Sequence, residues 1–377
     1  MKWAVTTATI AALLYGTFVF FVWKARDRDV SRFIVLSAQS VDEKQVPSGV
    51  TVSHKVGGYD GTAFYRLALN PFTRQRTEFG ITLDAPPYRQ QRILYPLLVW
   101  LLAAGHVSLV PWLLVAVNIA AVACLGGAGS ILAVRIGQHP LWGLLFALYP
   151  GFVYSVSRDL CEPLACAFGI AAMAAAASRR PWTAGALLTA AILTRETFVL
   201  LALAYGAAYL WSRFRYGAPP AAAAVFSIPL ACFVIWQLVL RMIWGVTPLI
   251  AGARSLTFPF AKYWSDVVAA SSLRHEHRLH FTELAFLALL TVLALMSFWA
   301  GSVALSWRLA FVGYLALAAT MPQESWSDDA AYMRVLGDYS VVSIAAVLHS
   351  RAAPRFILAA ATAAVWYYLA SHLVEFT

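Results

Sequence analysis

One carboxylate and two arginines stand out in the polar stretch that follows the first apolar run. The carboxylate is Asp60, within Gly57-Gly58-Tyr59-Asp60-Gly61, and the arginines are Arg89 and Arg92, next to Tyr88. A reachable carboxylate can act as a general base toward a hydroxyl. Guanidinium groups present a planar fork of donors that suits phosphate. These residues predict a base beside a binding site for a lipid-linked phosphate, at the water-facing side of a membrane protein.

Each of these residues also has a simpler interpretation. The flanking glycines allow unusual backbone angles and keep the Asp60 carboxylate accessible. Asp60 could instead cap a helix that begins near Thr62, which is a common use of Asp. If residues 88–95 are helical, Arg89 and Arg92 share a face. The alternative for the arginines is that they snorkel at a membrane edge beside aromatic residues.

A second group of charges lies at the junction of two apolar runs. Arg158 and Glu162 are spaced i,i+4, so they could form a surface ion pair of small energetic value. The functional alternative places Glu162 or Asp159 beside Asp60, where it would orient an acceptor or a metal ion. We expect Asp60 and Glu162 to be the catalytic carboxylates.

The pair Arg195-Glu196 interrupts a long apolar stretch. Two ionised residues there must face a cavity, a loop or each other. The pair is therefore either a tight turn between two short spans or a buried phosphate-binding pair, and Arg195 is the better candidate of the two. Arg334 follows the acidic loop of Glu324, Asp328 and Asp329, from which it could reach a phosphate.

Metal and cofactor motifs are weak or missing in the sequence. His275, Glu276, His277 and His280 lack the H-E-x-x-H spacing of zinc hydrolases and are more typical of a solvated loop. No Walker loop, G-x-G-x-x-G or G-x-S-x-G occurs, which argues against an ATP-driven pump, a dinucleotide enzyme or a serine hydrolase. No cofactor is predicted with certainty, and a divalent metal ion is left open.

Composition determines the class of protein that must position these residues. Of 377 residues, 61% are hydrophobic and 12% charged, against roughly 25% charged in soluble domains. We expect an all-α polytopic membrane protein with a single membrane domain over residues 1–377. The formal charge of +10 falls mostly between apolar runs, so it indicates membrane orientation rather than nucleic-acid binding.

Apolar runs predict about ten or eleven transmembrane helices. The first covers residues 3–23, and a short run at 93–105 is more typical of an interfacial or re-entrant helix. The other predicted spans are 109–134, 141–157, 160–177, 182–193, 198–211, 221–244, 284–300, 309–320, 335–348 and 356–374. Gly126-Gly127-Ala128-Gly129 should let helices approach closely.

Residues 24–91 form the one large polar segment, in which 30–36 and 62–69 are expected to be short strands or interfacial helices. Its side of the membrane depends on whether 93–105 crosses. Arginines in short loops, such as Arg135 and Arg213, indicate one cytoplasmic end. The opposite end should then collect the acidic residues after Asp84, with the exception of Asp338 and Glu375.

Several short motifs together resemble the GT-C superfamily of integral-membrane glycosyltransferases. They are the opening Tyr59-Asp60-Gly61-x-x-Phe64-Tyr65-Arg66-Leu67-Ala68, the segment Tyr95-Pro96-Leu97-Leu98, Tyr149-Pro150 with Ser157-Arg158-Asp159 and Glu162-Pro163, and Leu193-Thr194-Arg195-Glu196. The resemblance covers residues 1–215, with 216–377 as a variable set of spans, and is closest to the bacterial mannosyltransferase branch. The acidic pair often seen in the family is absent, because Tyr59 precedes Asp60.

Membership would imply inverting transfer of a sugar from a polyprenyl-phosphate donor, with residues 24–91 on the non-cytoplasmic face and Asp60 as base. The acceptor would be a lipid, glycan or protein, and the location a bacterial inner membrane with the site facing the periplasm or exterior. The expected substrate-binding residues are Tyr59, Tyr65, Tyr88, Arg89, Arg92, Arg158, Asp159, Arg195, Glu196 and Arg334. The competing hypotheses are a transporter or lipid flippase without chemistry and a non-catalytic scaffold.

Overall fold

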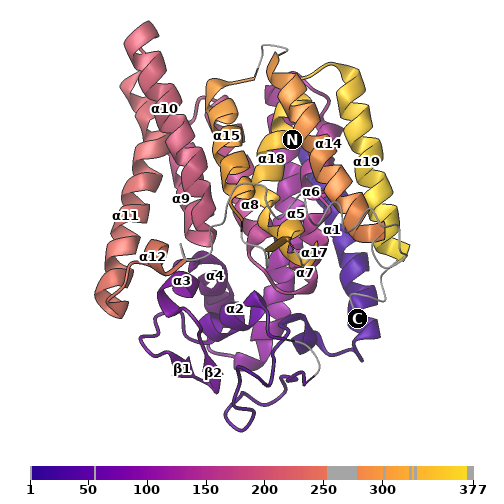
Figure 1. The fold of residues 1–377 in the computed structure, drawn as a ribbon, viewed down its shortest axis with the longest axis vertical. Coiled ribbons are helices and arrows are strands. Elements are labelled where there is room, and N and C mark those ends of the chain that lie inside the picture. Colours follow the sequence, from indigo (N-terminus) through magenta and orange to yellow (C-terminus); the bar gives the residue numbers. More distant parts are fainter. Residues whose placement is uncertain are drawn as a thin grey trace.

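The computed structural model describes residues 2–54, 57–252, 278–299, 303–321, 325–326 and 329–371. These residues are mostly helical, as predicted for an all-α polytopic membrane protein (Figure 1). The one sheet among them is a two-stranded antiparallel hairpin of β1 (Thr77–Glu78) and β2 (Ile81–Thr82), in the polar segment.

Among the described residues, five helical segments are long and apolar enough to cross a membrane, or six if one bent pair counts as a span. This finding supports an integral membrane protein, while the predicted count of ten or eleven spans stays a prediction. The five segments are Lys2–Ala25 (α1), Val107–Arg135 (ending in α5, Val110–Arg135), Glu196–Tyr216 (ending in α10, Val199–Tyr216), Pro220–Trp244 (ending in α11, Ala224–Trp244) and Leu279–Trp299 (in α14, Arg278–Trp299).

Shorter helices complete the bundle and its polar end. The shorter apolar ones are α4 (Leu94–Ala103), α8 (Glu162–Ala177), α9 (Pro181–Thr194), α15 (Leu305–Ala319) and α18 (Gly337–Leu348). The remaining α-helices are α2 (Asp60–Leu69), α3 (Pro86–Gln90), α6 (Leu144–Ala147), α7 (Gly151–Ser157), α12 (Pro248–Gly252), α17 (Asp329–Val335) and α19 (Ala352–Ser371).

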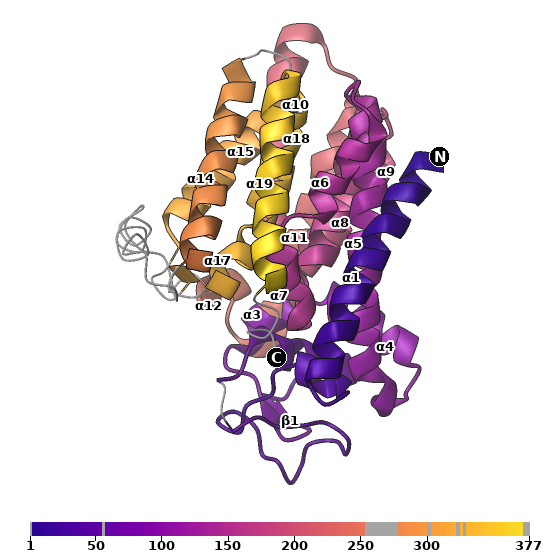
Figure 2. The ribbon, with the colours of Figure 1, turned by 90° about the vertical axis from the view of Figure 1, so that its right-hand side faces the viewer.

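The bundle and the polar segment form two layers (Figures 1 and 2). Long helices stand side by side, and the polar segment with α2, α3 and the hairpin caps one end. Helix α1 runs toward this cap, and α5 returns from it. The hydroxyl of Thr7 donates to the carbonyl of Gly126 at 2.9 Å, which places the first turns of α1 beside the later part of α5. Arg135 and the N-terminus therefore lie away from the cap.

Two segments that were expected to be either short strands or interfacial helices contain helical residues in the structure. Residues 30–33 form a 3₁₀ turn (Val30–Phe33), and residues 62–69 belong to α2. Helix α4 has ten residues, or about 15 Å of length, which is half of the roughly 30 Å hydrocarbon core. It packs against α2 and α5 at the capped end, and whether it crosses the membrane stays a prediction.

The predicted span 141–157 is broken. Helices α6 and α7 meet at 55° around Tyr149-Pro150, because proline removes a backbone donor and disfavours a helical conformation in the preceding residue. Two carbonyls freed by the break accept other bonds: Ala147 from the Tyr15 hydroxyl at 2.9 Å and Leu148 from the Trp366 indole at 2.7 Å. The break is therefore a stable feature that directs α7 toward the capped end.

Close helix contacts occur where glycine was predicted to allow them. A Cβ on Gly126 would lie 2.8 Å from the carbonyl oxygen of Thr7, and one on Gly129 would lie 2.7 Å from that of Gly143. Any larger side chain would separate α5 from α1 and from the turn before α6. The prediction that this stretch packs helices is confirmed.

Candidate functional site

In the described part of the chain, four acids in the first turn of a helical segment lie near an arginine of another segment. The partial positive charge at a helix N-terminus favours a carboxylate there. The acids are Asp60 in α2, Glu162 in α8, Glu196 in the 3₁₀ turn Glu196–Phe198 that leads into α10, and Asp338 in α18. The capped end of the bundle therefore carries a cluster of ion pairs, which we call the acid–arginine cluster.

Asp60 is the most connected carboxylate of this cluster. One oxygen accepts a bond from Arg89 at 2.5 Å, and the other lies 3.0 Å from Nη1 of Arg334 and 4.0 Å from Nη1 of Arg92. The capping interpretation is wrong, because Asp60 is the first residue of α2 rather than its N-cap and its carboxylate faces the arginines. The predicted meeting of Asp60 with the arginines is found.

The arginines determine the ionisation of Asp60. Burial alone would raise the pKa of this carboxyl, but Arg89, Arg334 and Arg92 outweigh burial and hold the pKa well below its usual range. Asp60 is therefore a carboxylate at any physiological pH. A strongly paired carboxylate is a weak base, so base catalysis requires that its arginines be drawn away.

Arg89 and Arg92 are engaged differently, although both approach Asp60. Arg89 forms a two-pronged ion pair with the exposed Asp84, at 2.8 Å for each bond. Arg92 is buried and forms a two-pronged pair with Glu196 at 2.7 and 2.8 Å. The ring of Tyr88 lies under both guanidinium groups, and its hydroxyl accepts a bond from Arg92 at 2.6 Å. These pairs exclude simple snorkelling.

A deeper layer connects Glu162, Arg195 and Arg334. The Glu162 carboxylate accepts from Arg195 at 2.6 Å and from Arg334 at 3.0 Å, and Glu162 is only 1% exposed. Nε of Arg195 lies 3.8 Å from Asp338, and the same guanidinium donates to the Val335 carbonyl at 3.0 Å. Glu162 is beside Asp60 through their shared arginine, and its expected catalytic role stays a prediction.

The structure shows the tight turn that was one of the two interpretations of Arg195-Glu196, while phosphate binding by the pair stays a prediction. The pair forms the tight turn between α9 and the turn leading into α10, and both side chains are held by the cluster. Their partners are not each other: Arg195 pairs with Glu162 and Glu196 with Arg92. Ion pairing with other segments offsets part of the desolvation cost of placing two charges in an apolar stretch.

Arg158 and Glu162 do not form the predicted surface pair. Helix α7 ends at Ser157 and α8 begins at Glu162, so the i,i+4 spacing does not lie on one helix. The Arg158 guanidinium lies over the rings of Tyr59 and Tyr154, at 5.2 and 5.6 Å. Within the described ranges no carboxylate is paired with it. Tyr59 also contacts Arg334, which lies 4.8 Å from the centre of its ring and donates to its hydroxyl at 3.2 Å.

Two expected substrate-binding residues are placed elsewhere. Tyr65 is fully buried on the core side of α2, and its hydroxyl has no hydrogen-bond partner in the described part of the chain. Asp159 is fully buried in the turn between α7 and α8, where burial raises the pKa of its carboxyl and Arg26 opposes this. Neither residue lines the cavity described next, and substrate binding by both stays a prediction.

A polar cavity of about 210 Å³ opens beside Asp60. Its wall combines the Asp60 and Asp84 carboxylates with Arg89, hydroxyl groups and a side-chain amide. The lining residues are Gln39, Ser40, Gly58, Tyr59, Asp60, Thr62, Ala63, Thr82, Leu83, Asp84 and Arg89. All of them belong to the polar segment that caps the helix bundle. Groups that can donate and accept hydrogen bonds surround a space for a small hydroxylated molecule.

Sequence reasoning missed two acids, Asp84 beside the acid–arginine cluster and Asp338 within it. Asp84 is five residues before Arg89, and the Pro86-Pro87 turn between them brings the two together. Asp338 was assigned to the end opposite the other acids, but its position near Arg195 places it among them. Its position at the start of an apolar run, like that of Glu162, was the signal that could have indicated this.

Metal ligands are not gathered in the part of the chain that the structure describes. No group of three or more His, Cys, Asp and Glu side chains there could hold a metal ion. His280 contacts the Tyr332 hydroxyl at 3.1 Å. His275, Glu276, His277, Glu324 and Asp328 lie outside the described residues.

Comparison with known proteins gives no relative. No family model matches the chain, and no curated protein or solved structure matches it.

Proposed function

We propose that this protein is a membrane glycosyltransferase that moves a sugar from a polyprenyl-phosphate-linked donor to an acceptor hydroxyl. The observation that carries the proposal is the position of Asp60. Its carboxylate lines a polar cavity together with Arg89, and it also contacts the guanidinium group of Arg334. A base is thereby placed beside a space for a hydroxylated acceptor and beside positive charge for a phosphate.

The transfer needs one base and one electrophilic site but no protonated acid. Asp60 takes the proton of the acceptor hydroxyl as its oxygen bonds to the anomeric carbon of the donor sugar. The bond from that carbon to the phosphate oxygen breaks, and the electron pair leaves with the polyprenyl phosphate. Attack opposite to the leaving group inverts the anomeric carbon. Arginines stabilise the negative charge that grows on the phosphate.

Binding of the donor would also activate the base. A donor phosphate competes with Asp60 for Arg89 and Arg334, because guanidinium groups bind phosphate with two-pronged geometry. As these contacts weaken, the pKa of Asp60 rises toward its ordinary range. Asp60 then becomes a stronger base only when the donor is in place, so removal of the acceptor proton is coupled to donor binding.

The remaining members of the cluster hold the arginines in place. Glu162 fixes Arg195 and Arg334, and Glu196 fixes Arg92. Arg158, which has no carboxylate partner in the described residues, supplies a further positive charge beside Tyr59. On this proposal Asp60 is the catalytic residue, while Glu162 and Glu196 are positioning residues.

The proposal includes the setting of the reaction. The capped end faces the periplasm or exterior of a bacterial inner membrane, and the Arg135 end faces the cytoplasm, in agreement with the positive-inside rule. The acceptor is a lipid, glycan or protein that offers a hydroxyl to the cavity. The mechanism uses this chain's own residues at each step.

A lipid flippase is the second candidate, and the broken α6–α7 segment favours it. Transporters often carry discontinuous helices whose freed backbone groups bind substrate near the membrane midplane. Here, however, side chains of α1 and α19 already bond to the freed carbonyls of Ala147 and Leu148. The ionisable cluster lies at one end of the bundle rather than at its middle. These observations favour chemistry over transport.

The deciding experiment measures sugar transfer in proteoliposomes that contain only this protein. The probe is polyprenyl-phosphate mannose with a tritium-labelled sugar, supplied with an acceptor extract from bacterial envelopes. Asp60→Asn should lower transfer at least about 100-fold while membrane expression is unchanged. The matched control is Asp27→Asn, which changes an exposed Asp of the same segment that is paired with Arg32.

Two results would overturn the proposal. Undiminished transfer by Asp60→Asn would remove the assigned base. Donor-independent movement of a fluorescent lipid across the bilayer, equal in the parent protein and in Asp60→Asn, would favour the flippase.

A further inference from the structure

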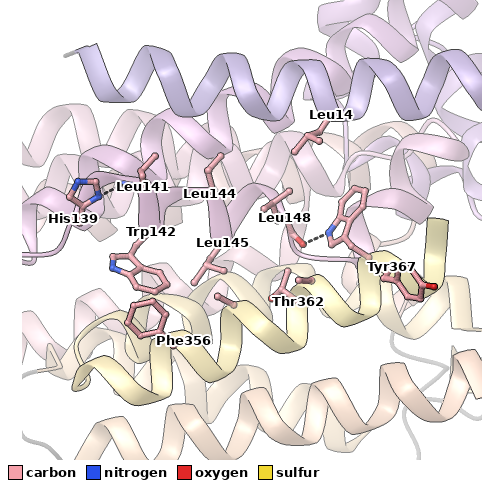
Figure 3. Close-up of a pocket in the computed structure, with 13 residues that line it drawn as sticks. Leu14, His139, Leu141, Trp142, Leu144, Leu145, Leu148, Phe356, Thr362 and Tyr367 are labelled. Carbon is pink, nitrogen blue, oxygen red and sulfur yellow. Dashed lines mark hydrogen bonds between the residues drawn. The ribbon is translucent and has the colours of Figure 1, made fainter. Parts of the chain in front are cut away.

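A second cavity lies within the helix bundle and is unrelated to the acid–arginine cluster. It is a groove of about 850 Å³ between α1, α6 and α19, and its walls are almost entirely apolar (Figure 3). The lining residues are Leu14, His139, Leu141, Trp142, Leu144, Leu145, Leu148, Phe356, Ala359, Thr362, Ala363, Trp366 and Tyr367.

The groove has the depth of one membrane leaflet. Along α19 it extends from Phe356 to Tyr367, which is about 16 Å at 1.5 Å per residue. The hydrocarbon core of a bilayer is roughly 30 Å thick, so this is about half of it. Helix α1 is one of the helices long and apolar enough to span a membrane, and it forms one wall. A groove of this depth and polarity matches a single lipid tail.

One end of the groove carries positive charge and aromatic rings. The Trp142 and Phe356 rings meet there, with centroids 5.1 Å apart, and the Arg355 guanidinium lies 5.7 Å from the centre of the Trp142 ring. In the described part of the chain, Arg355 has no carboxylate partner. The edge contact of His139 with Trp3 brings the first turn of α1, with Lys2, to the same end.

This charged end is remote from Asp60. Helix α19 begins beside it and runs toward the capped end, where the acid–arginine cluster lies (Figures 1 and 2). The other end of the groove, at Leu148 and Trp366, stops at the break between α6 and α7. A lipid whose phosphate contacts Arg355 must therefore belong to the leaflet opposite the cluster, and it is not the sugar donor proposed above.

We propose that this groove binds one acyl chain of an anionic phospholipid from the leaflet at the Arg355 end, with the lipid phosphate against Arg355. Tail and headgroup are recognised separately. The apolar walls accept any tail of suitable length, while the unpaired guanidinium favours a headgroup with net negative charge. The tail fills the space between α19 and the α6 turn and so stabilises the helix break. This inference does not depend on the proposed transferase activity.

The experiment is native mass spectrometry of the purified full chain, after exchange into micelles with equal amounts of phosphatidylglycerol and phosphatidylcholine. The parent protein should retain one phosphatidylglycerol in preference to phosphatidylcholine. Arg355→Gln should lower this preference about fivefold, which is the change in lipid affinity expected from one basic residue near an anionic membrane surface. Ala363→Phe, which places a ring in the groove at an exposed position, should lower retention of both lipids.

A matched arginine provides the control. Arg215 also lies over a tryptophan ring, that of Trp211 at 5.4 Å, but Trp211, unlike Trp142, does not line this groove. Arg215→Gln should leave the preference unchanged, and an equal loss in this variant would overturn the proposal. Unchanged retention in Ala363→Phe would also overturn it. So would a cysteine at position 363 that crosslinks two copies of the chain, because a protein helix would then occupy the groove.

Discussion

Nη1 of Arg334 lies 3.0 Å from a carboxylate oxygen of Asp60 and 3.0 Å from one of Glu162. A single nitrogen thus connects the start of α2 with the start of α8, and Nε of the same side chain donates to the Tyr59 hydroxyl. Arg334 comes from α17, near the end of the chain, so three distant segments meet at one guanidinium. This arrangement makes Arg334 the most informative residue to change.

Arg334→Lys should impair transfer more than it impairs folding. A lysine keeps the charge but has no planar fork, so it cannot contact Asp60, Glu162 and the Tyr59 hydroxyl together. We expect kcat to fall about 100-fold, in the range of a lost oxyanion donor. The measurement is initial-rate kinetics with polyprenyl-phosphate mannose. Arg241→Lys, at an exposed position at the end of α11, is the matched control. Parent-like kcat in Arg334→Lys would exclude a role in the reaction.

The stability of the folded protein should depend on pH through Asp60. Its pKa is depressed on folding, so its contribution is fully present above the unfolded value, about 3.9, and is lost as pH falls below that value toward the folded pKa. The difference in unfolding free energy between the parent protein and Asp60→Asn should be constant from about pH 8 to pH 5. It should then shrink by about 1 kcal/mol by pH 3.

The measurement is denaturant unfolding in detergent at each pH, followed by tryptophan fluorescence. Comparison of the two proteins cancels the other titrating groups, provided that both unfold in one transition. A free-energy difference that stays constant down to pH 3 would mean that Asp60 is not ion-paired in solution.

The sequence predicted the membrane class and most of the residues that meet in the cluster. Hydropathy and charge identify apolar runs and the charges that interrupt them, and Asp60, Arg89, Arg92 and Arg195 all belong to the cluster. The sequence did not predict which acidic side chain forms an ion pair with which arginine. Arg195 and Glu196 are adjacent, yet each pairs with a residue of another helix, because the turn points their side chains to different neighbours.

The role of Gly61 also differs from the prediction. The glycine was expected to supply unusual backbone angles, but no positive φ occurs at Gly57, Gly58 or Gly61. A Cβ on Gly61 would instead lie 2.4 Å from the Arg158 carbonyl oxygen and 2.7 Å from that of Ile34. Glycine is needed at position 61 because Arg158 and Ile34, which are distant in sequence, approach the backbone there. The local sequence carries no sign of this approach.

Gly61→Ala should therefore displace α2 and the carboxylate at its start. Two backbone carbonyls stand where the new methyl group would lie, and backbone cannot move aside as a flexible side chain can. We expect a loss of about 1–3 kcal/mol in unfolding free energy, as for other overpacked sites, together with reduced transfer. Gly57→Ala is the control, because nothing lies within 4 Å of a Cβ there. Equal stability of the two variants would show that α2 does not pack as described.

The two ends of the bundle should react with labels from opposite sides of the membrane. Lys44 is exposed in the polar segment, and Arg213 is exposed near the end of α10, away from the cap. Single cysteines at these positions, in a background without the four native cysteines, would be treated with a membrane-impermeant maleimide in intact cells. Position 44 should be labelled in intact cells and position 213 only after lysis, because short-loop arginines stay in the cytoplasm. The reverse pattern would place Asp60 in the cytoplasm, where the proposed donor site has no access to the outer leaflet.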